Sequence, residues 1–327
     1  MKKLGKRKAV VLMCTLACLI VICGEVFAAG GNQTILKLGH VMGTDIARHR
    51  AAIMMTNYVA EKTNNRIKIE VYPLAQMGGI KELQSGVQLG TVEMVILGSE
   101  LSNMEPLTDI LSLPYLYKDL NDAARVMMGP SAKEIFAKLE KKGVIVISAS
   151  PSGIRMVTTS KTAVKTPQDM KGMTIRVPNV KVHVSTIEAM GARPIPMPFG
   201  ELYLALKQGV VDGQENPAPQ IETAKLYEVQ KYLIKTNHII NPIFIIMNKK
   251  KFDSLSQEDR AVLTKGGELW SEQHINMLNE EDNALLKKFQ DKGMTIIEPD
   301  RESFRKACAG VIDKYPNFKD IYSRITK

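Results

Sequence analysis

Hydrophobic and polar residues follow two alternating periods along the first half of the chain. The strand period of two appears in three runs, at 35–41, 66–72 and 92–97. Helical periodicity fills the stretches between and after them, at 45–63, 80–89, 121–128 and 131–142. A further apolar strand is expected at 144–148. This alternation of strands and helices predicts a first α/β unit.

The same alternation starts again after Gly153. Strands are expected at 173–177, 194–197 and 210–212, and helices at 182–190, 200–208 and 217–227. Before the first of these strands, Thr166 supplies an N-cap oxygen, Pro167 suits the first helical position, and Asp169 complements the helix dipole. A short helix should begin there and end at Gly172. The sequence therefore predicts a second α/β unit.

The last part of the chain predicts one unusually long helix. An apolar strand at 239–247, interrupted by Asn241 and Pro242, comes first. Residues 256–259 then resemble a capping box, which opens a helix that runs to about Gln290. Such a helix is long for one lobe, so we expect it to brace both lobes; no heptad repeat supports a coiled coil. A strand at 294–298 and a helix at 300–314 are expected to close the chain.

The N-terminal residues have the pattern of a secretory signal peptide. Basic residues precede an apolar run at 9–23, and small residues follow, so we expect cleavage after Ala28, or after Ala29 if the site shifts by one residue. Two alternatives are a retained membrane anchor and lipidation of Cys23. The apolar run is shorter than the ~20 residues that span a bilayer, and Ile22 is a poor substitute for the small residue that lipidation requires. The sequence predicts a periplasmic protein with a signal peptide at 1–28.

Composition and charge narrow the class of function. Apolar residues make up 45% and charged residues 24% of the chain, which is typical of a globular protein. Removal of the signal leaves 39 basic and 33 acidic residues, a net charge of +6, so much of the basic excess serves targeting. No basic cluster is interleaved with aromatic residues, and we expect no nucleic-acid partner. Cys308 is the only cysteine outside the signal and is expected to be a buried thiol. No metal-binding spacing occurs, and no cofactor or metal is expected.

Arginine at a strand end is the main candidate for ligand chemistry. Arg176 lies near the end of the predicted strand 173–177, before Pro178. In open α/β sheets, that end of a strand faces the ligand crevice. A guanidinium there matches a carboxylate with two parallel hydrogen bonds. The sequence thus favours an organic anion as the ligand.

Three segments carry a resemblance to a known family, namely KGMTIRVPN, PMPFGELYLALKQGVVDGQENP and YEVQKYL; KLGH and LPYL are weaker support. The mature chain resembles the periplasmic solute-binding proteins of TRAP transporters, of the dicarboxylate-binding type. The resemblance implies an α/β, two-lobe periplasmic binding protein of type II-like architecture with hinge strands and a long bracing helix. We expect lobe I at 29–152 and 242–281, and lobe II at 153–241 and 282–327.

The resemblance also implies a function and a set of contacts. Such proteins are monomeric receptors rather than enzymes, and they deliver organic acid anions to integral membrane permease subunits. Arg176 matches the family arginine that grips the ligand carboxylate, and Arg155 matches a second arginine that reaches the ligand or forms an inter-lobe salt bridge. The remaining expected contacts are Asn216, which can instead cap the next helix, the pocket-lining or core ring of Phe199, and first-lobe His40 and Glu100.

The ligand class stays open between two kinds of acid. Sialic-acid receptors of this type have acidic residues at positions that resemble Gly79 and Leu97, so sialic acid is disfavoured. C4-dicarboxylates and sugar acids such as uronates remain, and His40 and Glu100 suit the hydroxyls of a uronate. The alternatives are a secreted enzyme acting on acidic sugars, with Glu100 and His40 as acid and base, or the binding component of another transporter or sensor.

Overall fold

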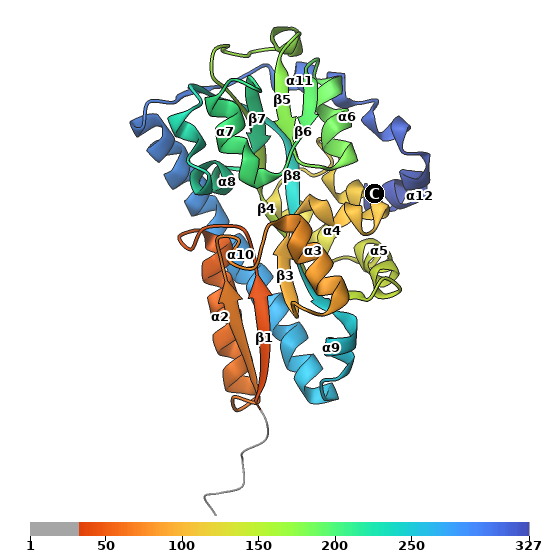
Figure 1. Ribbon diagram of the computed structural model, residues 1–327. Helices are drawn as coiled ribbons and strands as arrows, with labels where there is room; N and C mark the ends of the chain where they lie inside the picture. Colours follow the sequence, from red (N-terminus) through yellow and green to blue (C-terminus); the bar gives the residue numbers. More distant parts are fainter. Residues whose placement is uncertain (1–32, 327) are drawn as a thin grey trace, which may run out of the picture.

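One mixed sheet of nine strands organises the protein. The computed structural model describes residues 33–326 (Figure 1), and the predicted signal peptide lies outside the described residues. The strand order is β2-β1-β3-β8-β4-β7-β5-β6, and β9 pairs with β8. The strands are β1 Thr34–Gly39, β2 Ile67–Tyr72, β3 Met94–Leu97, β4 Val144–Thr159, β5 Thr174–Val177, β6 Arg193–Pro196, β7 Gly213–Asn216, β8 Tyr232–Asn248 and β9 Thr295–Ile297.

Two long antiparallel strands join the halves of this sheet. The first half holds β1, β2 and β3 beside the end of β8, and the second half holds β5, β6 and β7 beside the end of β4. β4 and β8 cross between the halves as a pair (Figure 1). The ranges predicted for these strands, 144–148 and 239–247, are shorter than β4 and β8. In the structure the two strands continue through Pro151 and Pro242, with shifts in the register of their pairing. Gly153, with φ +117°, lies at one such shift.

The predicted α/β alternation is confirmed, although both units share this one sheet. The helices of the first half are α2 Ala47–Lys62, α3 Ile80–Leu89, α4 Leu120–Met127 and α5 Pro130–Glu140. Those of the second half are α6 Lys181–Ala189, α7 Leu202–Lys207 and α8 Ala218–Thr223. After β8 come α9 Lys249–Asp253, α10 Gln257–Asp291, α11 Arg301–Cys308 and α12 Lys319–Ile325. The residue boundaries expected for the two lobes stay predictions.

Several other expected elements also differ from the structure. The strand expected at 210–212 is wrong, because the chain bends there and β7 follows at Gly213–Asn216. The helix expected at 217–227 ends at Thr223, since Lys225 adopts a left-handed conformation with φ 50°. The helix expected at 300–314 ends at Cys308 and is followed by a 3₁₀ turn. The short helix expected to end at Gly172 is a 3₁₀ turn at Pro167–Met170, and the Thr166 N–H donates to the Asp169 carboxylate at 2.8 Å.

The long helix α10 is confirmed, and it packs along both halves. The Ser256 side chain accepts a hydrogen bond from the Asp259 N–H and caps its start. α10 contacts α2 and β4, and farther along it contacts α8 of the second half (Figure 1). Trp270 is fully buried against α2 and donates its Nε1–H to the Arg48 carbonyl oxygen at 3.3 Å. Among residues 33–326, no helix is long and apolar enough to cross a membrane.

Candidate functional site

A small cavity lies where the two halves face each other. Its volume is about 50 Å³, and it opens into a wider groove of about 910 Å³ through shared walls that include Glu100, Arg176 and Phe199. Five of the six expected contact residues line the small cavity: Glu100, Arg155, Arg176, Phe199 and Asn216. The first comes from the segment after β3, and the others come from β4, β5, β7 and the turn before α7. The structure thus brings residues from distant parts of the sequence to one site.

Arg176 is buried with part of its guanidinium still able to bind an anion. The side chain is 2% exposed, and Nε and Nη2 donate to the Met197 carbonyl oxygen at 3.0 and 2.6 Å. This oxygen occupies one edge of the guanidinium, so the edge formed by Nη1 and Nη2 remains for a carboxylate. Burial lowers the pKa of Arg176 to about 10, against the opposing effect of Glu215, so the group stays charged at neutral pH.

Arg155 is held in a buried salt bridge. Its Nε and Nη2 donate to the two carboxylate oxygens of Glu215, and Nη2 also donates to Asn216 Oδ1 at 3.0 Å. Nη1 donates to Asn241 Oδ1 at 3.2 Å. Arg155 is 3% exposed and Glu215 is fully buried. Because β4 and β7 are neighbouring strands of the second half, this is not the inter-lobe salt bridge expected as the alternative to ligand contact. One N–H of Nη1 is left to reach a ligand in the cavity.

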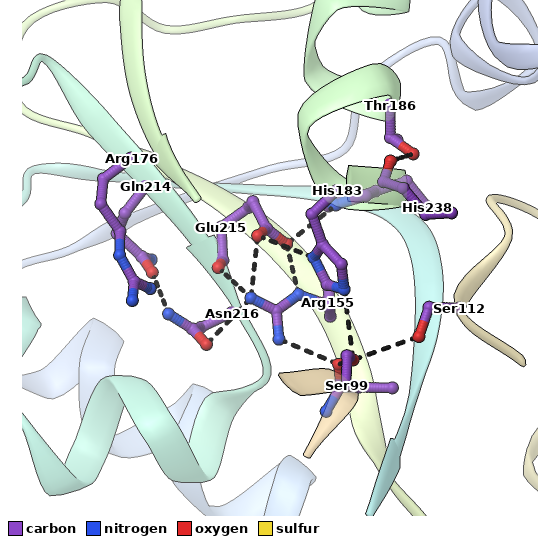
Figure 2. A network of polar contacts seen from close by, with 12 residues as sticks. Ser99, Ser112, Arg155, Arg176, His183, Thr186, Gln214, Glu215, Asn216 and His238 are labelled. Carbon is purple, nitrogen blue, oxygen red and sulfur yellow. Dashed lines mark hydrogen bonds and ion pairs between the residues drawn. The ribbon is translucent and has the colours of Figure 1, made fainter. Parts of the chain in front are cut away.

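Glu215 is the centre of the network that holds Arg155 (Figure 2). His183 Nδ1 lies 3.2 Å from Glu215 Oε1, and His238 Nε2 lies 3.2 Å from Oε2. Burial opposes the charge of Glu215, but Arg155 and the hydrogen bonds from both histidines outweigh it and hold the carboxyl pKa well below its usual range. On its other side, His183 Nε2 lies 3.2 Å from the Ser99 hydroxyl. Both histidines are therefore satisfied structural groups.

Asn216 faces the cavity and does not cap the following helix. Its Nδ2 donates to Gln214 Oε1 at 2.5 Å, while Oδ1 accepts from Arg155. Gln214 is in turn held by the Thr158 hydroxyl at 2.9 Å. The N-cap of α8 is Pro217 and has no side-chain hydrogen bond. The amide of Asn216 is therefore fixed at the cavity wall by β4 and β7 together.

Glu100 extends from the first half toward the same cavity. Its carboxylate lies close to Gly98, since a Cβ atom at that glycine would lie only 3.0 Å from Glu100 Oε2. The same Cβ would lie 3.5 Å from Asn241 Nδ2, so the carboxylate is folded back over the backbone beside β8. Gln84 holds the segment by donating to the Glu100 carbonyl oxygen at 2.7 Å.

His40 is the expected contact that the structure does not bring to the cavity. It is 1% exposed, and its Nε2 lies 3.0 Å from His49 Nδ1 while its Nδ1 accepts a hydrogen bond from the Met42 N–H. Burial, followed by the charges of His49 and Arg48, lowers the His40 pKa to about 3. A neutral imidazole with both nitrogens paired is a structural group. The acid–base pairing of His40 with Glu100 across the cleft has no geometric support.

Sequence reasoning missed Arg48, which also lines the cavity. This arginine is the second residue of α2, yet it is only 5% exposed. Burial lowers its pKa to about 10, and the charges of Glu281 and Glu100 oppose that shift. From the sequence alone, a single arginine on a helix is expected to be exposed to solvent, so the burial of Arg48 is apparent only from the tertiary structure. In residues 33–326 no cluster of side chains could hold a metal ion.

Known proteins resemble this chain in sequence and in fold. Residues 38–317 match the family model described as bacterial extracellular solute-binding protein, family 7. The 2,3-diketo-L-gulonate-binding periplasmic protein of Escherichia coli is 32% identical over 279 residues, which cover 85% of each chain. A TRAP periplasmic solute binding protein of Haemophilus influenzae, solved with bound L-gulonate, is 32% identical with a TM-score of 0.86 and covers 90% of this chain and 99% of its own. A similar protein of Roseobacter denitrificans with bound L-galactonate is 32% identical, with a TM-score of 0.85, and covers 91% and 100%.

Proposed function

The chain belongs to the bacterial extracellular solute-binding proteins of family 7, the solute receptors of TRAP transporters, and we propose that it binds the carboxylate of a sugar acid between its two halves. The relatives and solved neighbours are receptors for solutes, and several hold sugar acids. Export by the signal at 1–28 and delivery to integral membrane permease subunits are part of this proposal, with the C4-dicarboxylates as the alternative ligand class.

The observation that carries the proposal is the buried guanidinium of Arg176 at the cavity wall. Met197 aligns one of its edges, and the other edge presents two donors in the planar geometry of a carboxylate. In a site shielded from water, such charge-assisted bonds are stronger than on a surface. Arg155 contributes one further N–H, and Asn216 is fixed beside it as an amide contact.

The charge of the buried Arg176 guanidinium also favours closure of the two halves over the ligand. Burying Arg176 without an anion is unfavourable, so a carboxylate stabilises the closed arrangement relative to an open one. Moving a population from mostly open to mostly closed, from about 1:99 to about 99:1, needs ~5.5 kcal/mol of differential binding. A carboxylate on two donors, together with hydroxyl contacts, is within that range.

The test compares two substitutions on neighbouring strands. Arg176→Lys keeps the charge and loses the planar pair of donors, so affinity for L-gulonate or L-galactonate should fall tenfold or more. Arg193→Lys is the matched control, because Arg193 is exposed on β6, beside β5. Calorimetric titration of the mature protein measures both. Equal affinities of wild type and Arg176→Lys for an acid that wild type binds would refute the assigned role.

A further inference from the structure

Arg48 is a buried cation whose guanidinium has no direct hydrogen-bond or salt-bridge partner among residues 33–326. It is 5% exposed and lines the small cavity together with the second-half residues Arg176 and Asn216. Among the described residues, no acid forms a salt bridge with it and no acceptor takes a hydrogen bond from its guanidinium; Nε is buried without a partner. A guanidinium in this state is unfavourable unless something in the cavity accepts from it.

Neither of the two acids whose charge acts on Arg48, Glu281 and Glu100, accepts a hydrogen bond from its guanidinium in the described part of the chain. Glu281 of α10 accepts the Ala47 N–H at 2.6 Å at the start of α2 and pairs with Arg50 at 3.6 Å. Both contacts use Oε1, while Oε2 is buried without a hydrogen-bond partner. Glu281 acts on Arg48 through its charge, but the two form no salt bridge in the described part of the chain. Glu100 also acts on Arg48 through its charge, but it lines the cavity and forms no salt bridge in the part of the chain that the structure describes. Arg48 and Glu100 thus bring a donor-only and an acceptor-only group to one cavity.

A hydroxyl group is the chemistry that satisfies both. It can accept a hydrogen bond from the guanidinium and donate its own hydrogen to the carboxylate. The charges at the cavity support the same choice. Among the charged residues that line the cavity, Arg155 is neutralised by Glu215, so Arg48 and Arg176 set against Glu100 leave one net positive charge. A single carboxylate on the ligand balances that charge, whereas a second one would face Glu100.

We propose that Arg48 and Glu100 together bind the hydroxyl-bearing end of the ligand and make the receptor selective for polyhydroxy monocarboxylates over dicarboxylates. This inference rests on the proposed function, in which Arg176 holds the carboxylate. It deepens that function by assigning a second specificity group in the first half, and it decides between the two ligand classes that the sequence left open.

The experiment uses L-galactonate and galactarate, two acids that differ in whether the far end is a hydroxyl or a carboxylate. Wild type should bind L-galactonate at least tenfold more tightly than galactarate. Glu100→Gln removes the negative charge that opposes the second carboxylate, so the ratio of the two affinities should shift toward galactarate by tenfold or more. The proposal would be overturned if wild type bound galactarate more tightly than L-galactonate. It would also be overturned if Glu100→Gln left the ratio of the two affinities unchanged.

A second variant separates a specificity role for Arg48 from a structural one. Arg48→Met removes an unpaired buried charge, so the melting temperature without ligand should stay the same or rise, while affinity for L-galactonate falls tenfold or more. Lys62→Met removes one positive charge from an exposed position of the same helix and serves as the control. A lower melting temperature for Arg48→Met with unchanged affinity would show that Arg48 only supports the fold.

The two proposals fail in different ways. If wild type binds neither acid, or if Arg176→Lys binds L-galactonate as wild type does, the proposed function fails. If wild type binds L-galactonate and Arg176→Lys weakens it, but Arg48→Met and Glu100→Gln do not change affinity or selectivity, only the inference about Arg48 and Glu100 fails.

Discussion

Removing Glu215 should destabilise the protein more than any surface acid, because it leaves Arg155 buried without its counter-ion. Arg155 is 3% exposed and Glu215 is fully buried, and two of the guanidinium nitrogens donate to the carboxylate. Breaking such a pair by removing one partner costs about 3–5 kcal/mol. At roughly 2 °C for each kcal/mol in a chain of this size, Glu215→Ala should lower the melting temperature by about 6–10 °C.

The assay is thermal unfolding of the mature protein at pH 7 without ligand, arranged as a double-mutant cycle with Arg155→Met. The double variant should be more stable than Glu215→Ala alone, since it no longer contains the orphaned charge. Glu188→Ala is the control, because Glu188 pairs with Lys314 on the surface at 3.0 Å and such a pair contributes about 0–1 kcal/mol. A Glu215→Ala variant within about 1 kcal/mol of wild type, or strictly additive effects, would refute the reasoning.

Two further predictions concern the region between the halves and the start of β7. Burial, together with the neighbouring Glu281 charge, raises the pKa of Asp282 from 3.8 to about 7. Between these pH values the folded state holds a proton that the unfolded state has released. The free energy of unfolding should therefore fall as pH rises from about 4 to 7. Urea denaturation at a series of pH values measures this fall, which should be smaller in Asp282→Asn. Gly213→Ala should lower the free energy of unfolding by about 3 kcal/mol or more, because its Cβ would lie 2.2 Å from the Thr158 carbonyl oxygen. Gly200 has open space around it, so Gly200→Ala is the control and should leave stability unchanged. A small loss of stability in Gly213→Ala would contradict the close approach.

Periodicity predicted the elements whose burial follows from local pattern. Helix 80–89 matches α3, and the Ser256 cap and the length of α10 are confirmed. Periodicity failed at β7, where Val210, Val211 and Asp212 form a bend and the strand that follows at 213–216 buries three polar side chains. Those polar side chains are buried because Thr158 and Arg155 of β4 satisfy them, and partners so distant in sequence leave no local signal.

Breaker residues misled the prediction of the connecting strands. Pro151, Gly153 and Pro242 normally end extended runs, yet β4 and β8 continue past them, because each strand is held by its partner on both sides of the irregularities. At the site, too, local sequence patterns predicted only part of the arrangement. The strand-end position of Arg176 could be read from the sequence, whereas the pairing of His40 with His49 and the burial of Arg48 depend on how α2 packs against the sheet and α10.

The most direct test of the central claim is a crystal structure of the mature protein with L-gulonate or L-galactonate bound. The account predicts the carboxylate on Nη1 and Nη2 of Arg176, with Met197 still accepting from the opposite edge of the guanidinium. A bound acid whose carboxylate lies elsewhere, with Arg176 bonded to Met197 alone, would contradict it.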